Sequence, residues 1–415
     1  MASLGSFRTR SVAATLPRGR CLLMIVPCPS RTIQAARPAC PCARSPRAAA
    51  PPPPAAPAGV EAPLPAELYA RPPGLSYAAQ YRQVFSAAAS DGAKLPIRRL
   101  LPKIDPVAQA AVPGAKRVLL SSVAATPQVP LFFGRPWDAR DRLYAGFMLA
   151  IHALALLAPF TFSYANLGLF LAGYFVTGAL GITLSFHRQL SHKAFRTPKW
   201  LEYALAYCGV LAVQGDPLEW CSAHKYHHLN CDTVLDPHSP YEGFWWSHCG
   251  WLMDNTTTEA RVYDRSNVAD MEAQPFYRWI RDTYVWHVVA QFAALYALGG
   301  LGALVWGGAL RLCWVYHITW FVNSASHVWG WQDYASGDQS RNNWWVGILA
   351  FGEGWHNNHH TFEFSACHGL EWWQLDGTWY LICLLKALGL ATDIKLPSER
   401  QKQKLRIRQP ASTAA

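Results

Sequence analysis

Charged side chains are scarce in this chain of 415 residues. They make up 15% of it, against 51% hydrophobic and 13% aromatic residues, whereas a soluble globular domain usually has about 25% charged residues. The sequence therefore predicts a membrane protein. The formal net charge of +11 would ordinarily suggest a nucleic-acid partner, but eight arginines lie within residues 1–60 and leave +3 for the rest. We therefore expect no nucleic-acid partner.

Acidic residues and lysine are missing from residues 1–60, which are rich in Ser, Thr, Ala, Pro and Arg. This composition is typical of an organelle transit peptide, and the apolar run at 21–26 is too short for a secretory signal. A disordered basic tail is the alternative. We expect a transit peptide and disordered leader at 1–60, followed by an N-terminal linker and amphipathic region at 61–134.

Several familiar site patterns are also absent. The eleven cysteines include none at disulfide or zinc-site spacing in the main body, which predicts free thiols in a reducing compartment. No His-Glu-x-x-His zinc motif occurs. No flavin or nicotinamide fingerprint follows a strand–helix unit, and no haem domain is fused at either end, so electrons for any redox reaction must come from a partner.

Two long uncharged tracts are present instead. Residues 143–187 carry no charge and contain a polar turn near 162–167, and residues 285–332 carry only Arg311 and a glycine-rich bend. A membrane span needs about 20 apolar residues, so each tract predicts a hairpin of two transmembrane helices, with buried helices of a soluble core as the alternative. We expect Arg311 to extend to the interface, and residues 375–391 to lie along the interface rather than cross it.

Eight histidines fall in three tight groups, two of which repeat His-x-x-His-His. In a helix, relative positions zero, three and four share one face, and imidazole is a ligand for iron, copper and zinc. Because each hairpin returns to its starting side, the groups should meet and hold two metal ions, for which non-haem iron fits better than zinc or haem. The five-residue interval between His187 and His192 predicts that a helix ends between them, near Leu190 and Ser191. By contrast, His152, His287 and His317 are expected to be packed core residues.

Three segments carry a specific resemblance. His-Arg-Gln-Leu-Ser-His at 187–192, His-Lys-Tyr-His-His at 224–228 and His-Asn-Asn-His-His at 356–360 resemble the three histidine boxes of membrane fatty acyl desaturases. Asp-Pro-His-Ser at 236–239, Gly-Phe-Trp-Trp-Ser-His at 243–248 and Asn-Ser-Ala-Ser-His at 323–327 extend the likeness over about 135–395. It implies an all-α integral membrane domain at 135–395, with four transmembrane helices capped by a metal-holding helical domain, and a basic tail at 396–415.

The resemblance also implies roles for individual residues. Asn323 would hold a metal-bound water, and Gln214, Trp220 and Thr319 would line the bend of the acyl channel. His238 and His248 would be structural. The nine implied ligands of the two irons are His187, His192, His224, His227, His228, His327, His356, His359 and His360.

Within this family the likeness is closest to the plastid and cyanobacterial acyl-lipid type, through Ser-Arg-Asn-Asn-Trp-Trp at 340–345 and Glu-Gly-Trp-His-Asn-Asn-His-His at 353–360. It implies a multi-pass plastid membrane enzyme whose metal site faces the stroma. Such an enzyme would use dioxygen and ferredoxin to place a cis double bond at carbon seven or nine of a saturated C16 or C18 chain on a lipid such as monogalactosyldiacylglycerol. A di-iron hydroxylase and a non-enzymatic membrane metal carrier are the alternatives.

Overall fold

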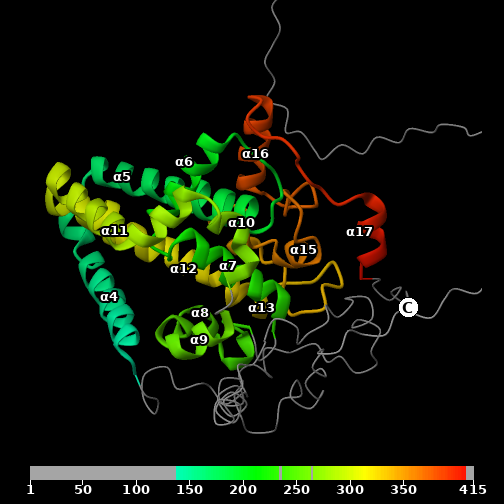
Figure 1. The fold of residues 1–415 in the computed structure, drawn as a ribbon, viewed down its shortest axis with the longest axis horizontal. Helices are drawn as coiled ribbons and strands as arrows, with labels where there is room; N and C mark the ends of the chain where they lie inside the picture. The colour runs from blue at the N-terminus through cyan, green and yellow to red at the C-terminus, as the bar shows by residue number, and fades with distance from the viewer. Residues whose placement is uncertain (1–136, 233–235, 263–264, 408–415) are drawn as a thin grey trace, which may run out of the picture. The chain divides into compact units, whose positions relative to one another are not determined.

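The computed structural model describes residues 137–232, 236–262 and 265–407, all within one compact unit. The expected leader at 1–60 and linker at 61–134 lie outside these residues, as do 408–415 of the tail. Every regular element in the described part is a helix, and the only β-pairings there are isolated bridges. The predicted all-α class is therefore correct for this part of the chain (Figure 1).

The first uncharged tract forms two helices joined by a turn. Helix α4 (Ala139–Ala155) begins with a capping box between Asp138 and Asp141 and leads through η3 (Ala158–Thr161) to a turn. Ser163 then caps α5 (Tyr164–Tyr174), which continues directly into η4 (Phe175–Ser191). Together α5 and η4 form one continuous stretch of 28 residues that is long and apolar enough to cross a membrane.

The second uncharged tract forms a long, bent helical segment. Helix α11 (Pro275–Ala303) contains a break at Gly300, whose φ of 62° is readily adopted only by glycine. The chain continues through η8 (Leu304–Leu310), α12 (Arg311–Asn323) and α13 (Ala325–Val328). Because α11 packs against η8, the chain folds back at this break. The described residues thus hold two continuous stretches that are long and apolar enough to span a membrane, 164–191 and 275–328.

Arg311 corrects one expectation. It does not extend to an interface but is 3% exposed. Its guanidinium donates hydrogen bonds to the carbonyls of Gly307 and Leu211 and to the side-chain oxygen of Gln291. A buried guanidinium is tolerated when its donors are satisfied, so these partners remove the need to reach water.

Short helices connect the two tracts. Lys199–Val210 forms α6, and Pro217–Asn230 forms α7, whose first amides are capped by Asp216. The segment that follows contains η5 (Pro240–Glu242), α8 (Phe244–His248), η6 (Gly250–Met253), α9 (Asn255–Val262), η7 (Arg265–Val268) and α10 (Ala269–Glu272).

After the second tract come α14 (Trp344–Leu349), α15 (His356–Thr361), α16 (Gly377–Ala387) and α17 (Glu399–Leu405). The 11 residues of α16 extend about 16 Å, roughly half of the apolar thickness of a bilayer. This helix alone cannot cross, as expected for residues 375–391.

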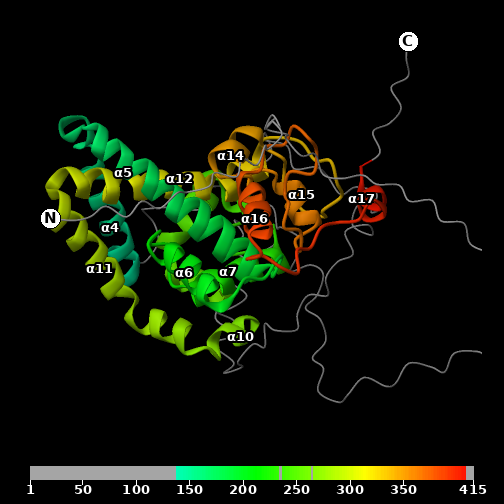
Figure 2. The same cartoon turned by 90° about the horizontal axis from the view of Figure 1, so that it is seen from above.

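Helix η4 is the central element of the fold. It packs against α5, α6, α7 and α16, and Figure 2 shows α6, α7, α15 and α16 gathered near one end of the long helices. The tightest approach is to α6, because a Cβ placed on Gly181 would lie 2.5 Å from the backbone nitrogen of Gly209. The last turn of η4 and the first residue beyond it carry the first histidine group, so this packing fixes their position.

Candidate metal centre

The nine histidines meet in two adjoining groups. In each group, one ring nitrogen from every histidine lies within 4.8 Å of those from the others. The first group, called group A, contains His187, His192, His224, His228 and His359. The second, called group B, contains His227, His327, His356 and His360.

The first histidine box lies at a helix end, as the sequence predicts. The helix ends at Ser191, between His187 and His192, and His192 is its C-cap. The amide of His192 donates to the carbonyl of His187 over 3.2 Å, an i to i+5 hydrogen bond of the π type. This wider turn brings the rings to a centroid separation of 4.9 Å. A π-type turn at the helix end therefore brings together two histidines that an ordinary α-helix would not align.

The two His-x-x-His-His boxes divide their histidines in complementary ways. On α7, His224 and His228 join group A while His227 joins group B. On α15, His359 joins group A, and His356 and His360 join group B. Positions zero and four thus contribute to one group and position three to its neighbour, so each box links both groups.

His327 and Asn323 lie at the end of the second tract. His327 is in α13 and buried, and its Nε2 is 3.0 Å from that of His356. Asn323 is the half-buried last residue of α12, one helical turn before His327.

Carboxylates hold the outer nitrogens of three rings at short distance. The Nδ1 atoms of His187, His227 and His360 lie 2.7, 3.0 and 2.8 Å from carboxylate oxygens. A ring that donates Nδ1–H to a carboxylate presents the lone pair of Nε2 on its other side, the arrangement common around metal-bound histidine. The partners, in the same order, are Glu353, Asp236 and Asp338.

The protonation states suit metal binding. Burial, reinforced by neighbouring imidazoles, lowers the pKa of His192, His224 and His228 well below the usual value, so these rings are neutral at pH 7. Burial would raise the pKa of Asp236, but the His227 imidazole outweighs it and the pKa falls below its usual value. Neutral imidazole is the form that binds a metal.

The positions of the inner nitrogens fit metal ions. The Nε2 of His359 lies 3.0 Å from the Nε2 atoms of both His187 and His228. A metal–imidazole distance of about 2.1 Å places two nitrogens at right angles roughly 3 Å apart. In addition, the buried Nε2 of His360 has no hydrogen-bonding partner in the part of the chain that the structure describes. The donor set of neutral nitrogens is one that iron accepts.

A buried network supports group A and includes residues to which the sequence reasoning gave no role. Arg188 is fully buried and forms two hydrogen bonds, each 2.9 Å, with the carboxylate of Asp376, and it also contacts Glu353. Glu353 contacts His187 and the Nδ1 of His368, the latter at 3.1 Å. The ring of His368 lies 4.3 Å from that of His359. Arg188 and Glu353 lie inside motifs already quoted, but only the folded contacts show their roles.

The three residues expected at the channel bend also lie together. The indole of Trp220 donates to the side-chain oxygen of Gln214 over 3.2 Å, and the Gln214 amide donates to Thr319 over 3.2 Å. Trp220 stacks on His224 with a centroid separation of 5.1 Å. This hydrogen-bonded trio therefore adjoins group A.

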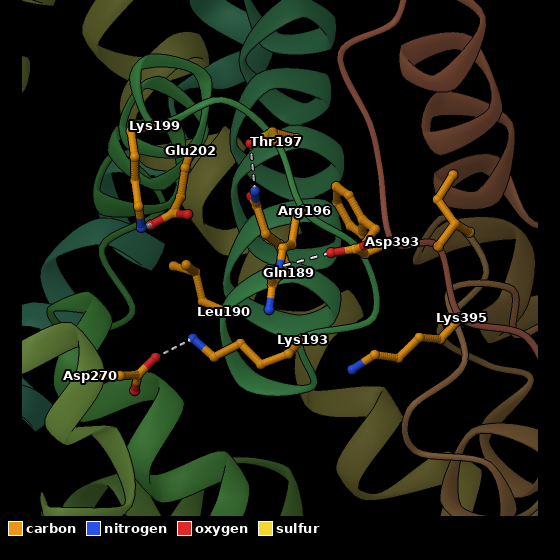
Figure 3. A pocket seen from close by; sticks show the side chains of 12 residues that line it. Gln189, Leu190, Lys193, Arg196, Thr197, Lys199, Glu202, Asp270, Asp393 and Lys395 are labelled. Carbon is orange, nitrogen blue, oxygen red and sulfur yellow. Dashed lines mark hydrogen bonds and ion pairs between the residues drawn. The ribbon is translucent and has the colours of Figure 1, made fainter.

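A cavity of about 790 Å³ lies elsewhere, beside the segment that follows His192 (Figure 3). Lys193 pairs with Asp270 there, and Arg196 pairs with Asp393. None of the nine histidines lines this cavity, and its charged walls do not suit a saturated hydrocarbon chain. It is therefore separate from the candidate metal centre.

Comparison with known proteins agrees with this geometry. The fatty acid desaturase family profile matches residues 162–382. The chain is 56% identical over 291 residues to palmitoyl-monogalactosyldiacylglycerol delta-7 desaturase, chloroplastic, of Arabidopsis thaliana, covering 70% of this chain and 78% of that protein. It is 50% identical to icosanoyl-CoA 5-desaturase of Limnanthes douglasii, over 70% and 82% of the two chains. Delta-9 acyl-lipid desaturase 1 of Arabidopsis thaliana is 48% identical, over 65% and 88%. Since the family profile covers more than half of the chain, this protein belongs to the fatty acid desaturase family.

Proposed function

We propose that this protein places a cis double bond at carbon seven or nine of a saturated C16 or C18 acyl chain carried by a plastid galactolipid. The meeting of nine histidines beside the Trp220 trio is the observation that carries the proposal. The relative of highest identity among the three above is named for palmitoyl-monogalactosyldiacylglycerol and the delta-7 position. The others are named for positions five and nine and for different acyl carriers. The double-bond position is therefore the most specific part of the proposal.

The nine histidines would hold two iron ions, five in group A and four in group B, and Asn323 would contribute through a water molecule. Two bound irons would supply the redox chemistry that couples dioxygen reduction to desaturation of the acyl chain. Glu353, Asp236 and Asp338 keep the Nδ1 protons on His187, His227 and His360, so the Nε2 lone pairs are free to bind the metals.

The chain's other task is to place one methylene pair beside the irons. Gln214, Trp220 and Thr319 form the bend of the acyl channel, because their polar groups hydrogen-bond one another and need no polar partner from the acyl chain. The stacking of Trp220 on His224 sets the distance from this bend to group A. Correct positioning alone can contribute a large part of a rate enhancement.

The protein crosses the plastid membrane four times, and its metal centre faces the stroma. The break at Gly300 and the packing of α11 on η8 support a second hairpin, and α4 with α5–η4 supplies the first. Stromal ferredoxin delivers the electrons. Basic residues near His192, including Lys193 and Lys395, support the approach of an acidic carrier.

Expression in a cyanobacterium, with double bonds mapped in each lipid class, tests this proposal. We expect a new double bond at carbon seven or nine of a galactolipid chain. His227→Ala and His359→Ala, one from each group, should abolish it and lower bound iron, while His287→Ala should retain both. A hydroxylated product would favour the hydroxylase, and iron bound without dioxygen consumption would favour a metal carrier.

A further inference from the structure

Positive charge is concentrated in residues 395–407, called the basic strap, which contain α17. The strap carries five lysines and arginines and one glutamate, a net charge of +4. This exceeds the +3 of the whole chain after residue 60. The five cations are Lys395, Arg400, Lys402, Lys404 and Arg406.

Backbone hydrogen bonds tie both ends of the strap to segments next to the metal centre. The amide of Lys395 donates to the carbonyl of Ala194, two residues after His192. The amide of Ile407 donates to the carbonyl of Asp333, in the loop that leads from α13 to α14. Figures 1 and 2 show α17 at the end of the fold away from α5 and α11. In the proposed topology the strap therefore faces the stroma.

Three of the five cations have no carboxylate partner in the described part of the chain. Lys402 pairs with Glu399, and Arg406 pairs with Glu371. In contrast, the cavity near His192 pairs two of its cations with aspartates. The strap thus attracts an anionic partner more strongly than the cavity does. Its exposed cations without an ion pair are Lys395, Arg400 and Lys404.

The strap has little apolar surface with which to enter a membrane. Helix α17 reads Glu-Arg-Gln-Lys-Gln-Lys-Leu and has no buried residue. A helix that lies on a membrane needs an apolar face as well as positive charge. The composition therefore favours an acidic soluble protein over anionic lipid as the partner.

Two exposed tryptophans adjoin the strap. Trp372 and Trp373 directly follow the glutamate that pairs with Arg406, and they are 82% and 43% exposed. Tryptophan and arginine are enriched among the residues that contribute most to protein–protein binding. The ring of Trp373 also lies 5.5 Å from that of Trp355, which directly precedes His356. A protein that binds here therefore lies close to group B.

Resting on the proposed desaturase function, we infer that the basic strap and the two tryptophans form the docking surface for the acidic one-electron carrier, ferredoxin. Each double bond takes two hydrogens from the acyl chain. Reduction of dioxygen to two waters then needs two more electrons and two protons. The protons come from bulk water, and two reduced carriers dock in turn, each losing one electron.

Lys404→Glu tests the electrostatic part of this surface. Biolayer interferometry measures the binding of plant-type [2Fe–2S] ferredoxin to iron-loaded protein in nanodiscs of phosphatidylcholine and galactolipid, which carry no net charge. We expect the association rate to fall about 3- to 10-fold at low ionic strength, because interfacial charges act mainly on association. The difference should disappear at about 0.5 M salt, where charges are screened.

Lys386→Glu is the matched control. Lys386 is an exposed cation on α16, outside the strap, and forms no ion pair in the described part of the chain. The substitution makes the same change in charge as Lys404→Glu and should leave ferredoxin binding unchanged.

Trp372→Ala tests the aromatic part. We expect ferredoxin affinity to fall about tenfold or more, as for a central interface tryptophan. This loss should persist at high salt, because apolar contact is not screened.

A chemical reductant separates docking from the metal centre. With dithionite, Lys404→Glu and Trp372→Ala should form the double bond at the wild-type rate per bound iron, whereas with ferredoxin both should be slower. A loss that persists with dithionite would overturn the docking surface. So would absence of ferredoxin binding by wild type, equal binding by Lys404→Glu and Lys386→Glu, or an effect of Lys404→Glu confined to nanodiscs that contain anionic lipid.

Failure of the proposed function gives a different result. If ferredoxin binding depended on Lys404 and Trp372 as expected but neither reductant gave a double bond in any lipid class, the docking surface would stand and the desaturase assignment would fall.

Discussion

Carboxylates that contact the Nδ1 atoms of the histidines fix the orientation of the rings. Glu353 is buried and contacts His187, His368 and Arg188. Burial would raise its pKa, yet the His187 imidazole and the Arg188 guanidinium hold the pKa well below its usual value. The carboxylate is therefore ionised and can fix the His187 ring by accepting its Nδ1 proton.

Glu353→Gln should lower iron affinity about 10- to 100-fold, the usual effect of removing such a partner. The glutamine amide has one oxygen acceptor, whereas the two oxygens of the Glu353 carboxylate contact three neighbouring side chains. Metal competition with a chelator measures the change. Glu363→Gln is the matched control, because Glu363 lies 3.6 Å from His228 with a 41% exposed side chain, and its effect should be small. Equal losses in the two variants would contradict this role for Glu353.

Glu242 gives a pH dependence away from the histidines. It is buried against Arg261, and burial, only partly offset by that guanidinium, raises its pKa to about 7. The folded state then binds this proton more tightly than the unfolded state, whose glutamate titrates near 4.5. The stabilisation of the folded state by the protonated Glu242 is therefore fully present below about pH 4.5 and is lost as pH rises toward 7.

Glu242→Gln should weaken the dependence of protein stability on pH between pH 4.5 and 7. Glutamine cannot ionise, so the unfolding temperature of the variant should fall less than that of wild type between pH 4.5 and 7. Thermal unfolding of iron-free protein in detergent measures both slopes. Parallel slopes would show that Glu242 is already ionised in the folded protein.

Among the elements, η4 shows where sequence periodicity is informative and where it is not. The spacing of His187 and His192 indicated correctly that an ordinary α-helix does not align them. It did not reveal the i to i+5 hydrogen bond that does. π turns are rare, and this one lies in a helix packed tightly on α6. Hydrogen-bond register depends on such tertiary contacts, which side-chain spacing does not encode.

Gly181→Ala should disturb this packing and the metal centre with it. The new methyl group would lie 2.5 to 2.6 Å from the backbone of Cys208 and Gly209, which cannot move aside as a flexible side chain can. We expect a loss of about 1–3 kcal/mol in stability and less bound iron, measured by thermal unfolding and metal analysis.

Gly168→Ala is the control within the preceding helix. A Cβ there has no neighbour within 4 Å in the described structure, and alanine favours a helix over glycine by roughly 0.5–1 kcal/mol. This variant should be as stable as wild type or slightly more so. If Gly181→Ala behaved in the same way, the α6–η4 contact would not set the position of His187.

For the whole molecule, the sequence predicted the helical class and which histidines lie together. Uncharged tracts and repeated His-x-x-His-His motifs are local patterns, so they can be recognised from short segments of sequence. The division of each box between groups A and B was not predicted, nor were the partners of Arg311 or the place of His368. Those depend on contacts such as Arg311 with Leu211 and His368 with Glu353, which join residues that the sequence keeps apart.

The proposed four-span topology predicts on which side of the membrane particular residues lie. Phe160 and Leu298 are 84% and 89% exposed near the two hairpin turns, while Trp372 is 82% exposed in the segment after α15. If both hairpins cross and return, cysteines at 160 and 298 lie on the side opposite the histidines, and a cysteine at 372 shares their side.

Sealed vesicles with the metal side outward distinguish these positions. An impermeant maleimide–polyethylene glycol should add one mass shift to Trp372→Cys relative to the parent protein. It should add none to Phe160→Cys or Leu298→Cys until detergent opens the vesicles. Labelling of Phe160→Cys or Leu298→Cys in intact vesicles would mean that the corresponding hairpin does not cross. The histidines of η4 and α13 would then need another route to one side, because in the proposed topology two complete crossings per hairpin place His187 and His327 on the same side.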